Sequence, residues 1–184
     1  MWYSNNYRRH LADMHVADWN EKFLSEFSYE DYVENLKTAK ITNAMIYLQS
    51  HAGLCYFPTK NGELHKAFIG KEDTMRKLFD LCHANGIAVT GYYSLIYNTA
   101  EHDKHPEWRM LLESGCSRRE SRVDQTNAKI KLEFASTRTV RYGLCCPNNM
   151  DYRKFVYEQI DEMVSLYPDM KGIFYDMPFW GHTC

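Results

Sequence analysis

The segment Gly172-Ile173-Phe174-Tyr175-Asp176-Met177-Pro178-Phe179-Trp180 joins an apolar run to a carboxylate, a proline and two aromatic rings. In a parallel α/β sheet the buried strands are apolar, and their carboxyl ends open into the loops that form the site. We therefore interpret the run as a strand that places Asp176 at the mouth of a barrel or crevice. An aspartate after a strand can also begin a turn or cap a helix, which is the alternative at this point.

The rest of the chain alternates between strand and helix patterns. Further strands are predicted at residues 9–16, 44–49 and 87–94, and helices after a Ser28 cap, at 72–84, from Pro106 and after Asn149. This alternation predicts a parallel α/β sheet with right-handed crossovers. An eight-stranded barrel takes about 200–250 residues, so four strands indicate the N-terminal half of a (β/α)8 TIM barrel. A small doubly wound sheet is the alternative.

Two alternating stretches interrupt this repeat. Ile130, Leu132 and Phe134 alternate with polar residues, as do the residues from Val140 to Leu144. We interpret them as a hairpin inserted between the third and fourth strands. Residues 1–184 then form a single domain that stops before the barrel closes. Half a barrel leaves sheet edges open, so we expect a homo-oligomer.

Composition narrows the choice of class. The 184 residues are 45% hydrophobic and 25% charged, which suits one globular domain. A net charge of −2 gives no electrostatic reason to expect a nucleic acid or an anionic membrane as partner. The N-terminus lacks the apolar core of a signal peptide, which favours a cytoplasmic location. The six cysteines contain no Cys-x-x-Cys pair, so we expect reduced thiols. The sequence also gives no reason to expect a cofactor.

Polar and aromatic side chains follow each predicted strand. The candidate site residues are Asp13 and His15 at the end of the first strand, His51 after the second, Tyr93 at the end of the third, and Asp176 and Trp180 at and after the end of the fourth. Carboxyl ends of parallel strands share one edge, so we expect these residues to lie together. An ionised aspartate can attack an anomeric carbon, and imidazoles can bind sugar hydroxyls. Each residue also has a structural alternative, such as core packing for Tyr93.

Two of these segments resemble motifs of α-L-fucosidases. Those enzymes carry His-His-Asp-Gly-Phe after the second strand, and Ser50-His51-Ala52-Gly53-Leu54 followed by Phe57-Pro58-Thr59-Lys60 matches it. They also carry a nucleophilic aspartate after an aromatic run, which Phe174-Tyr175-Asp176-Met177 matches. From about His10 to Trp180 the chain is similar to a hypothetical glycosyl hydrolase family related to α-L-fucosidases.

The resemblance implies a retaining glycoside hydrolase that acts on carbohydrates, with Asp176 as nucleophile. Ser50 and Ala52 replace a histidine and an aspartate of the fucosidase motif, so fucose specificity does not carry over. A retaining enzyme also needs a second carboxyl about 5–5.5 Å from the nucleophile. No carboxylate in the sequence is a convincing candidate, and the resemblance implies that this residue lies beyond Cys184.

Two other functions are compatible with the sequence. Asp13-Met14-His15 offers two metal ligands one residue apart, which would suit a metal-dependent hydrolase barrel. The missing acid/base residue would suit a barrel fragment that binds carbohydrate without catalysis. Metal analysis and a search for further βα units distinguish these functions from the first.

Overall fold

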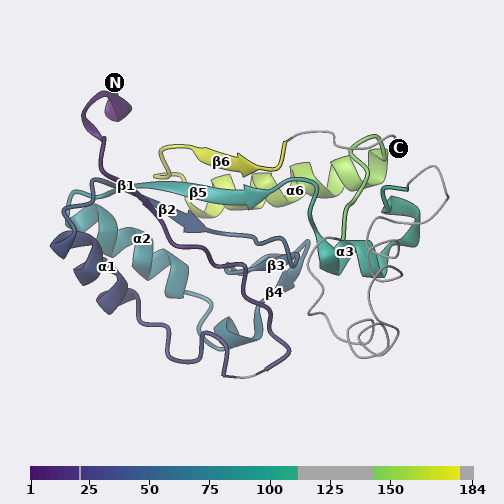
Figure 1. Ribbon diagram of the computed structural model, residues 1–184, viewed down its shortest axis with the longest axis horizontal. Coiled ribbons are helices and arrows are strands. Elements are labelled where there is room, and N and C mark those ends of the chain that lie inside the picture. The colour runs from purple at the N-terminus through teal and green to yellow at the C-terminus, as the bar shows by residue number, and fades with distance from the viewer. Residues whose placement is uncertain (21, 112–142, 179–184) are drawn as a thin grey trace, which may run out of the picture.

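The computed structural model describes residues 1–20, 22–111 and 143–178 (Figure 1). Its centre is a sheet of four strands, β1 (Arg9–Leu11), β2 (Asn43–Tyr47), β5 (Ala88–Ser94) and β6 (Ile173–Asp176). The spatial order β1-β2-β5-β6 follows the chain, and every neighbouring pair is parallel. The predicted α/β fold, with four parallel strands of a partial barrel, is confirmed.

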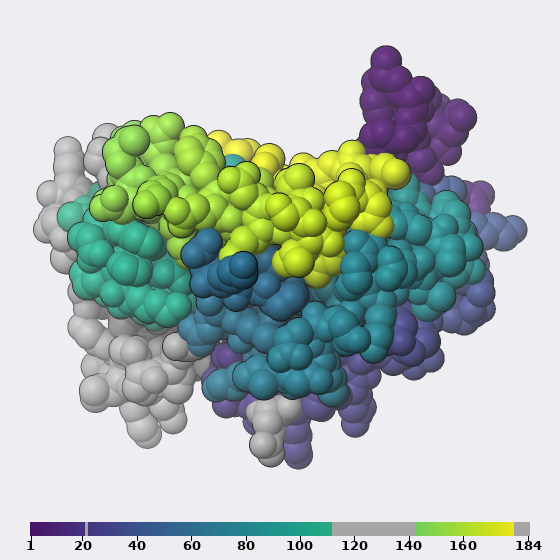
Figure 2. Space-filling model, turned by 180° about the vertical axis from the view of Figure 1, so that it is seen from behind, coloured from purple at the N-terminus to yellow at the C-terminus, as the bar shows by residue number. Residues whose placement is uncertain are grey.

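Three long helices connect these strands. They are α1 (Tyr29–Thr38), α2 (Thr74–Ala84) and α6 (Met150–Leu166), and Figure 2 shows α6 lying along the surface of the molecule. Ser28 caps α1 by accepting a hydrogen bond from the backbone of Asp31, and Asn149 caps α6 in the same way. The apolar stripe of α2 is fully buried, from Met75 to Cys82. Local signals therefore define these helices, and burial of their apolar faces holds them in place.

The first strand is shorter than its pattern predicts. β1 ends at Leu11, and Asp13 then accepts a hydrogen bond from the backbone N–H of His15 at 2.8 Å. A side chain that bonds the backbone two residues on favours a turn over a strand. His15 consequently lies in a loop, where it bends over the end of the sheet instead of standing on it.

The segment after β5 also departs from the prediction. An additional helix, α3 (Thr99–Lys104), begins after an Asn98 cap, and Pro106 opens only a single 3-10 turn, η3 (Pro106–Trp108). The backbone of α3 holds the loop after β2, because Thr99 donates to the carbonyl of His51 at 3.1 Å. Most of the predicted hairpin, residues 130–142, lies outside the described residues.

A small second sheet shapes the loop that carries His51. Its two-residue strands, β3 (Leu54–Cys55) and β4 (Glu63–Leu64), pair in parallel ahead of the 3-10 turn η2 (Lys66–Phe68). Gly53 reaches β3 with φ of +81°, and a Cβ there would lie 2.1 Å from the Asn98 side-chain oxygen. Only glycine fits both the backbone conformation and the space.

Two further features concern the N-terminus and the helices. The N-terminal 3-10 turn η1 (Trp2–Asn5) has no buried residue and stands away from the body in Figure 2. None of the helices in the described ranges has both the length and the apolar character to cross a bilayer.

The cysteines differ in their bonding state. Cys55, Cys82 and Cys145 are free and buried, whereas Cys146 is disulfide-bonded. The expectation of reduced thiols is therefore wrong at Cys146.

Candidate active site

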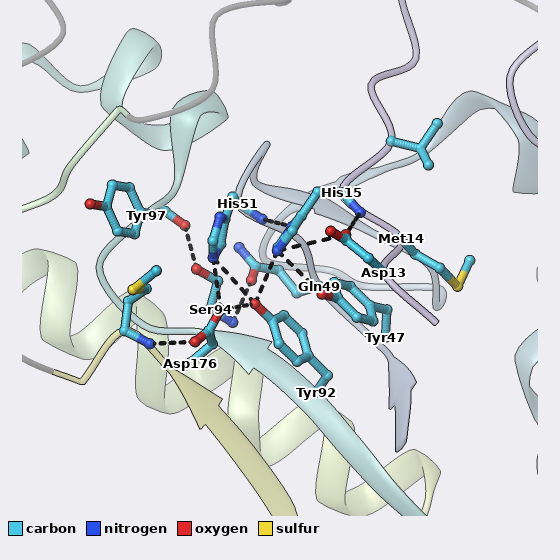
Figure 3. A network of polar contacts seen from close by, with 12 residues as sticks. Asp13, Met14, His15, Tyr47, Gln49, His51, Tyr92, Ser94, Tyr97 and Asp176 are labelled. Carbon is cyan, nitrogen blue, oxygen red and sulfur yellow. Dashed lines mark hydrogen bonds and ion pairs between the residues drawn. The ribbon is translucent and has the colours of Figure 1, made fainter. Parts of the chain in front are cut away.

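Side chains from all four strand ends meet at the carboxyl edge of the sheet (Figure 3). His15 comes from the loop after β1, His51 from the loop after β2, and Asp176 is the last residue of β6. Tyr47 and Tyr92 complete the group from β2 and β5. We call these five residues the Asp176 cluster. The predicted meeting of His15, His51 and Asp176 at one edge is therefore found in the structure.

Asp176 receives hydrogen bonds on both carboxylate oxygens. Oδ2 accepts from the hydroxyl of Tyr92 and lies 3.0 Å from Nε2 of His51, while Oδ1 accepts from the backbone of Met177 at 2.9 Å. Burial alone would raise the pKa of Asp176, but the bonds from Tyr92 and His51 outweigh it and the pKa is lowered. The side chain is 25% exposed. Asp176 is therefore an ionised carboxylate that a ligand can reach.

Tyr47 and Tyr92 form the buried side of the cluster. Their rings stack with centroids 3.8 Å apart and planes 13° apart, and both are almost fully buried. Burial and the bond to Asp176 raise the pKa of Tyr92 well above its ordinary value, so its hydroxyl remains a donor. Burial is also the main cause that raises the pKa of Tyr47 to about 12. Sequence reasoning did not identify either tyrosine.

The prediction that Tyr93 lines the site is wrong. Tyr93 is 0% exposed, and its hydroxyl donates to Oε1 of Gln159 on α6 at 2.7 Å. Side chains alternate between the two faces of a strand, so Tyr92 and Tyr93 point in opposite directions. Ser94 lies opposite Asp176 in the sheet, and this register puts Tyr92 on the face of the carboxylate. Counting back two residues from Ser94 would have identified Tyr92.

Of the two other predicted site residues, the structure describes Asp13 but not Trp180. Asp13 lies at the rim of the cluster with its side chain 67% exposed, and its Oδ1 is 4.0 Å from Nε2 of His15. It holds the turn that presents His15, through its bond to the backbone of that residue. Trp180 lies outside the described residues, and its predicted contact with a sugar stays a prediction.

The spacing of three side chains raises the possibility of a metal ion. One ligand atom each from His15, His51 and Asp176 lie within 4.8 Å of one another. However, Nδ1 of His15 accepts the backbone N–H of His51 at 3.1 Å, so the proton of a neutral ring is on Nε2. The Tyr92 hydroxyl also lies 3.2 Å from both Nε2 atoms, in the position between the three groups. These contacts favour a hydrogen-bonded cluster over a metal centre.

The sequence matches a protein-family model described as hypothetical glycosyl hydrolase 6, over residues 28–177. The chain belongs to the hypothetical glycosyl hydrolase 6 family. The matched range includes His51, Tyr92 and Asp176, and it begins after His15. This membership confirms the resemblance that the motifs around His51 and Asp176 suggest.

Solved structures agree with the family at the level of the fold. Alpha-L-fucosidase isoenzyme 2 from Paenibacillus thiaminolyticus has a TM-score of 0.73 and 23% identity, and the match covers 97% of this chain and 24% of that one. The Thermotoga maritima alpha-fucosidase in complex with fucose has a TM-score of 0.54 and 17% identity, covering 92% of this chain and 31% of that one.

A hypothetical protein from Ruminiclostridium thermocellum ATCC 27405 is also similar, with a TM-score of 0.57 and 15% identity, covering 91% of this chain and 74% of that one. No curated protein matches the sequence. The chain therefore shares the fold of these fucosidases and spans about a quarter of the length of the first of them. Its activity and substrate follow from the Asp176 cluster only as proposals.

Proposed function

We propose that this chain forms the nucleophile-bearing part of a retaining glycoside hydrolase of the α-L-fucosidase type. Asp176 is the nucleophile, and the substrate is the glycoside of a sugar that binds at the carboxyl edge of the sheet. Family membership and the fold support the general class. The arrangement of the Asp176 cluster supports the assignment of the residue.

The observation that carries the proposal is the state of the Asp176 carboxylate. It is ionised, held in one orientation by three hydrogen bonds, and 25% exposed. An oxygen of such a carboxylate can form a bond to the anomeric carbon while the glycosidic C–O bond breaks. The leaving oxygen then takes a proton from a general acid, and water later releases the sugar from Asp176.

His51 contacts the nucleophile, and its place in the segment that resembles the fucosidase motif supports a role in binding the sugar. It is only 6% exposed, and its ring lies between the rings of His15 and Tyr97. The neighbouring Ser50 and Ala52 stand where fucosidases carry a histidine and an aspartate, so two sugar contacts differ. We therefore expect the preferred sugar to differ from fucose in its hydroxyl pattern, which a panel of aryl glycosides tests.

Among the residues that the structure describes, none is placed to act as the general acid of this mechanism. Within residues 1–20, 22–111 and 143–178, Asp13 is a second carboxylate near the cluster, but it is largely exposed and holds the turn at His15. Glu101 is 3% exposed and paired with Lys104 at 2.9 Å. Neither has the accessible, unpaired carboxyl that protonation of a leaving group requires. We propose that a carboxyl outside the described residues supplies this function.

Covalent trapping tests the nucleophile directly. One similar structure is a fucosidase from Bacteroides thetaiotaomicron trapped with 2-fluoro-fucosyl fluoride. Full-length protein treated with a set of 2-fluoro glycosyl fluorides should gain the mass of one 2-fluoro sugar. Peptide mapping should place that mass on Asp176.

Two variants make this experiment decisive. Asp176→Asn should abolish labelling and reduce turnover by several orders of magnitude while the fold is retained. Asp73→Asn is the matched control, because Asp73 pairs with Lys77 on α2 and its side chain is 61% exposed. Labelling that persists in Asp176→Asn, or that maps to another carboxylate, would contradict the assignment. Sugar binding without labelling or turnover would indicate a carbohydrate-binding protein instead.

A further inference from the structure

The ring of His15 has partners that fix the position of its proton. The backbone N–H of His51 lies 3.1 Å from Nδ1, and the hydroxyls of Tyr47 and Tyr92 each lie 3.2 Å from Nε2. A backbone N–H can only donate, so Nδ1 must accept. A proton on Nδ1 would set two donors against each other. The ring is therefore neutral and carries its proton on Nε2.

Tyr92 passes the direction of this hydrogen bond on to Asp176. Its hydroxyl proton is donated to Oδ2 of Asp176, which leaves the hydroxyl oxygen to accept from Nε2 of His15. Three donors therefore follow one another, from the backbone of His51 to His15, from His15 to Tyr92, and from Tyr92 to Asp176. Each bond fixes the direction of the next.

The surroundings of His15 leave it little freedom. Its side chain is 8% exposed and stacks on His51 with ring centroids 3.6 Å apart. Tyr47 and Tyr92 meet the ring edge to face at 5.0 and 5.6 Å. Asp13, on the same loop as His15, has its carboxylate 4.0 Å from Nε2. The ring is thus held between the ends of β1, β2 and β5.

We propose that His15 is a positioning residue for Asp176, which acts through the hydroxyl of Tyr92 and does so as the neutral Nε2–H tautomer. The proposal rests on the proposed function in taking Asp176 as the nucleophile. It gives His15 a role other than the sugar contact that the sequence suggests. Nucleophilic attack needs a carboxylate held in line with the anomeric carbon, so loss of this role lowers kcat and leaves KM largely unchanged.

Two substitutions of His15 separate its two hydrogen bonds. In His15→Asn the carboxamide replaces Nδ1 and can accept from His51, but it is too short to reach Tyr92. In His15→Gln the carboxamide reaches the position of Nε2 and can donate to Tyr92. On an aryl glycoside, His15→Asn in the full-length protein should lower kcat about ten-fold, and His15→Gln should recover most of that loss. Equal losses in both variants would overturn the proposal, and thermal melts check that both remain folded.

A double substitution tests whether His15 acts through Tyr92. Once Tyr92→Phe has removed the hydroxyl, adding His15→Asn should cause no further loss of kcat. Losses that multiply, or that appear in KM, would mean that His15 contacts the sugar directly, and the proposal would be overturned.

Two measurements by NMR require no turnover. The ring ¹⁵N shifts of His15 should show the Nε2–H tautomer, and an Nδ1–H tautomer would overturn the proposal. The carboxyl ¹³C shift of Asp176 reports its titration, and the midpoint should rise in His15→Asn but not in His15→Gln. An unchanged midpoint in His15→Asn would also overturn it. If no glycoside is hydrolysed, the proposed function fails while these measurements still decide the role of His15.

Discussion

Asp176 keeps its charge because two hydrogen bonds outweigh the effect of burial on its pKa. Tyr92→Phe removes one of them and leaves the burial, so the pKa of Asp176 should rise. A nucleophilic carboxylate works above its pKa, and the acid limb of kcat/KM should therefore move to higher pH. Tyr93→Phe is the matched control, because its hydroxyl bonds Gln159 on the opposite face. A limb that does not move in Tyr92→Phe would contradict this account.

Asp169 allows a second prediction, about stability and pH. Its pKa is lowered chiefly by hydrogen bonds from Arg76, at 2.9 and 2.6 Å, and His83 lies 2.8 Å away. A carboxyl whose folded-state pKa is lowered contributes stability above its unfolded pKa of about 4, and loses it as the pH falls through the folded value. Asp169→Asn should therefore lower Tm by a few degrees near neutrality, and by progressively less below pH ~4. Thermal melts from neutral to acid pH measure this, and an equal loss at every pH would contradict it.

Among the residues of the Asp176 cluster, the sequence predicted the aspartate and the two histidines but not the two tyrosines. His15, His51 and Asp176 lie at or after strand ends, and this position pointed to them in the sequence. Tyr47 is the last residue of β2 and Tyr92 lies inside β5, and only the register of the sheet shows which face they occupy. The prediction chose Tyr93, and the neighbouring Tyr92 is the residue whose side chain lies in the site. The direction of the hydrogen bonds around His15 depends on distances that no sequence pattern contains.

Among the elements, the loop between β2 and β3 places the most demanding constraint on the chain. Gly53 has φ of +81°, and a Cβ there would lie 2.8 Å from Cβ of Ala100 as well as against Asn98. Gly53→Ala should cost more than about 2 kcal/mol of unfolding free energy and displace the loop that carries His51. Gly70 is a matched control, because it has φ of +77° with nothing within 4 Å of the added atom.

Gly70→Ala should therefore show the backbone cost alone, about 1 kcal/mol. Denaturant unfolding of the two variants gives both values. Equal losses would mean that the contact with Asn98 and Ala100 adds nothing, contrary to this prediction.

The helices were predictable wherever a cap and an apolar stripe coincide. Ser28 and Asn149 mark the starts of α1 and α6, and Asn85-Gly86 follows the end of α2. α3 has six residues and no apolar stripe, and it is stabilised by the Asn98 cap and by contacts with the loop after β2. Such short elements depend on tertiary contacts, which explains why the sequence pattern did not show it.

For the molecule as a whole, the outer edges of β1 and β6 pair with no strand among the described residues. Leu11 on β1 and Phe174 and Tyr175 on β6 are 40 to 42% exposed. Open strand edges with apolar side chains recruit further strands. We therefore expect the isolated 184-residue chain to self-associate, as light scattering would show.

A charge on an edge strand discourages pairing, so Tyr175→Lys should reduce the association. The comparison needs equal concentrations of the two proteins and a far-ultraviolet spectrum to show that both are folded. A stable monomer with a cooperative melt would contradict the expectation for the parent chain.

The order of the strands also has a consequence for synthesis of the protein. Because β1, β2, β5 and β6 are neighbours in the same order in space and in sequence, each unit can add to the one before it as the chain leaves the ribosome. His15, Tyr47, His51 and Tyr92 can assemble early, and Asp176 arrives with the last of these strands. Until β6 joins the sheet, an unfinished chain therefore holds the hydrogen-bond donors of the cluster without the carboxylate that accepts from them.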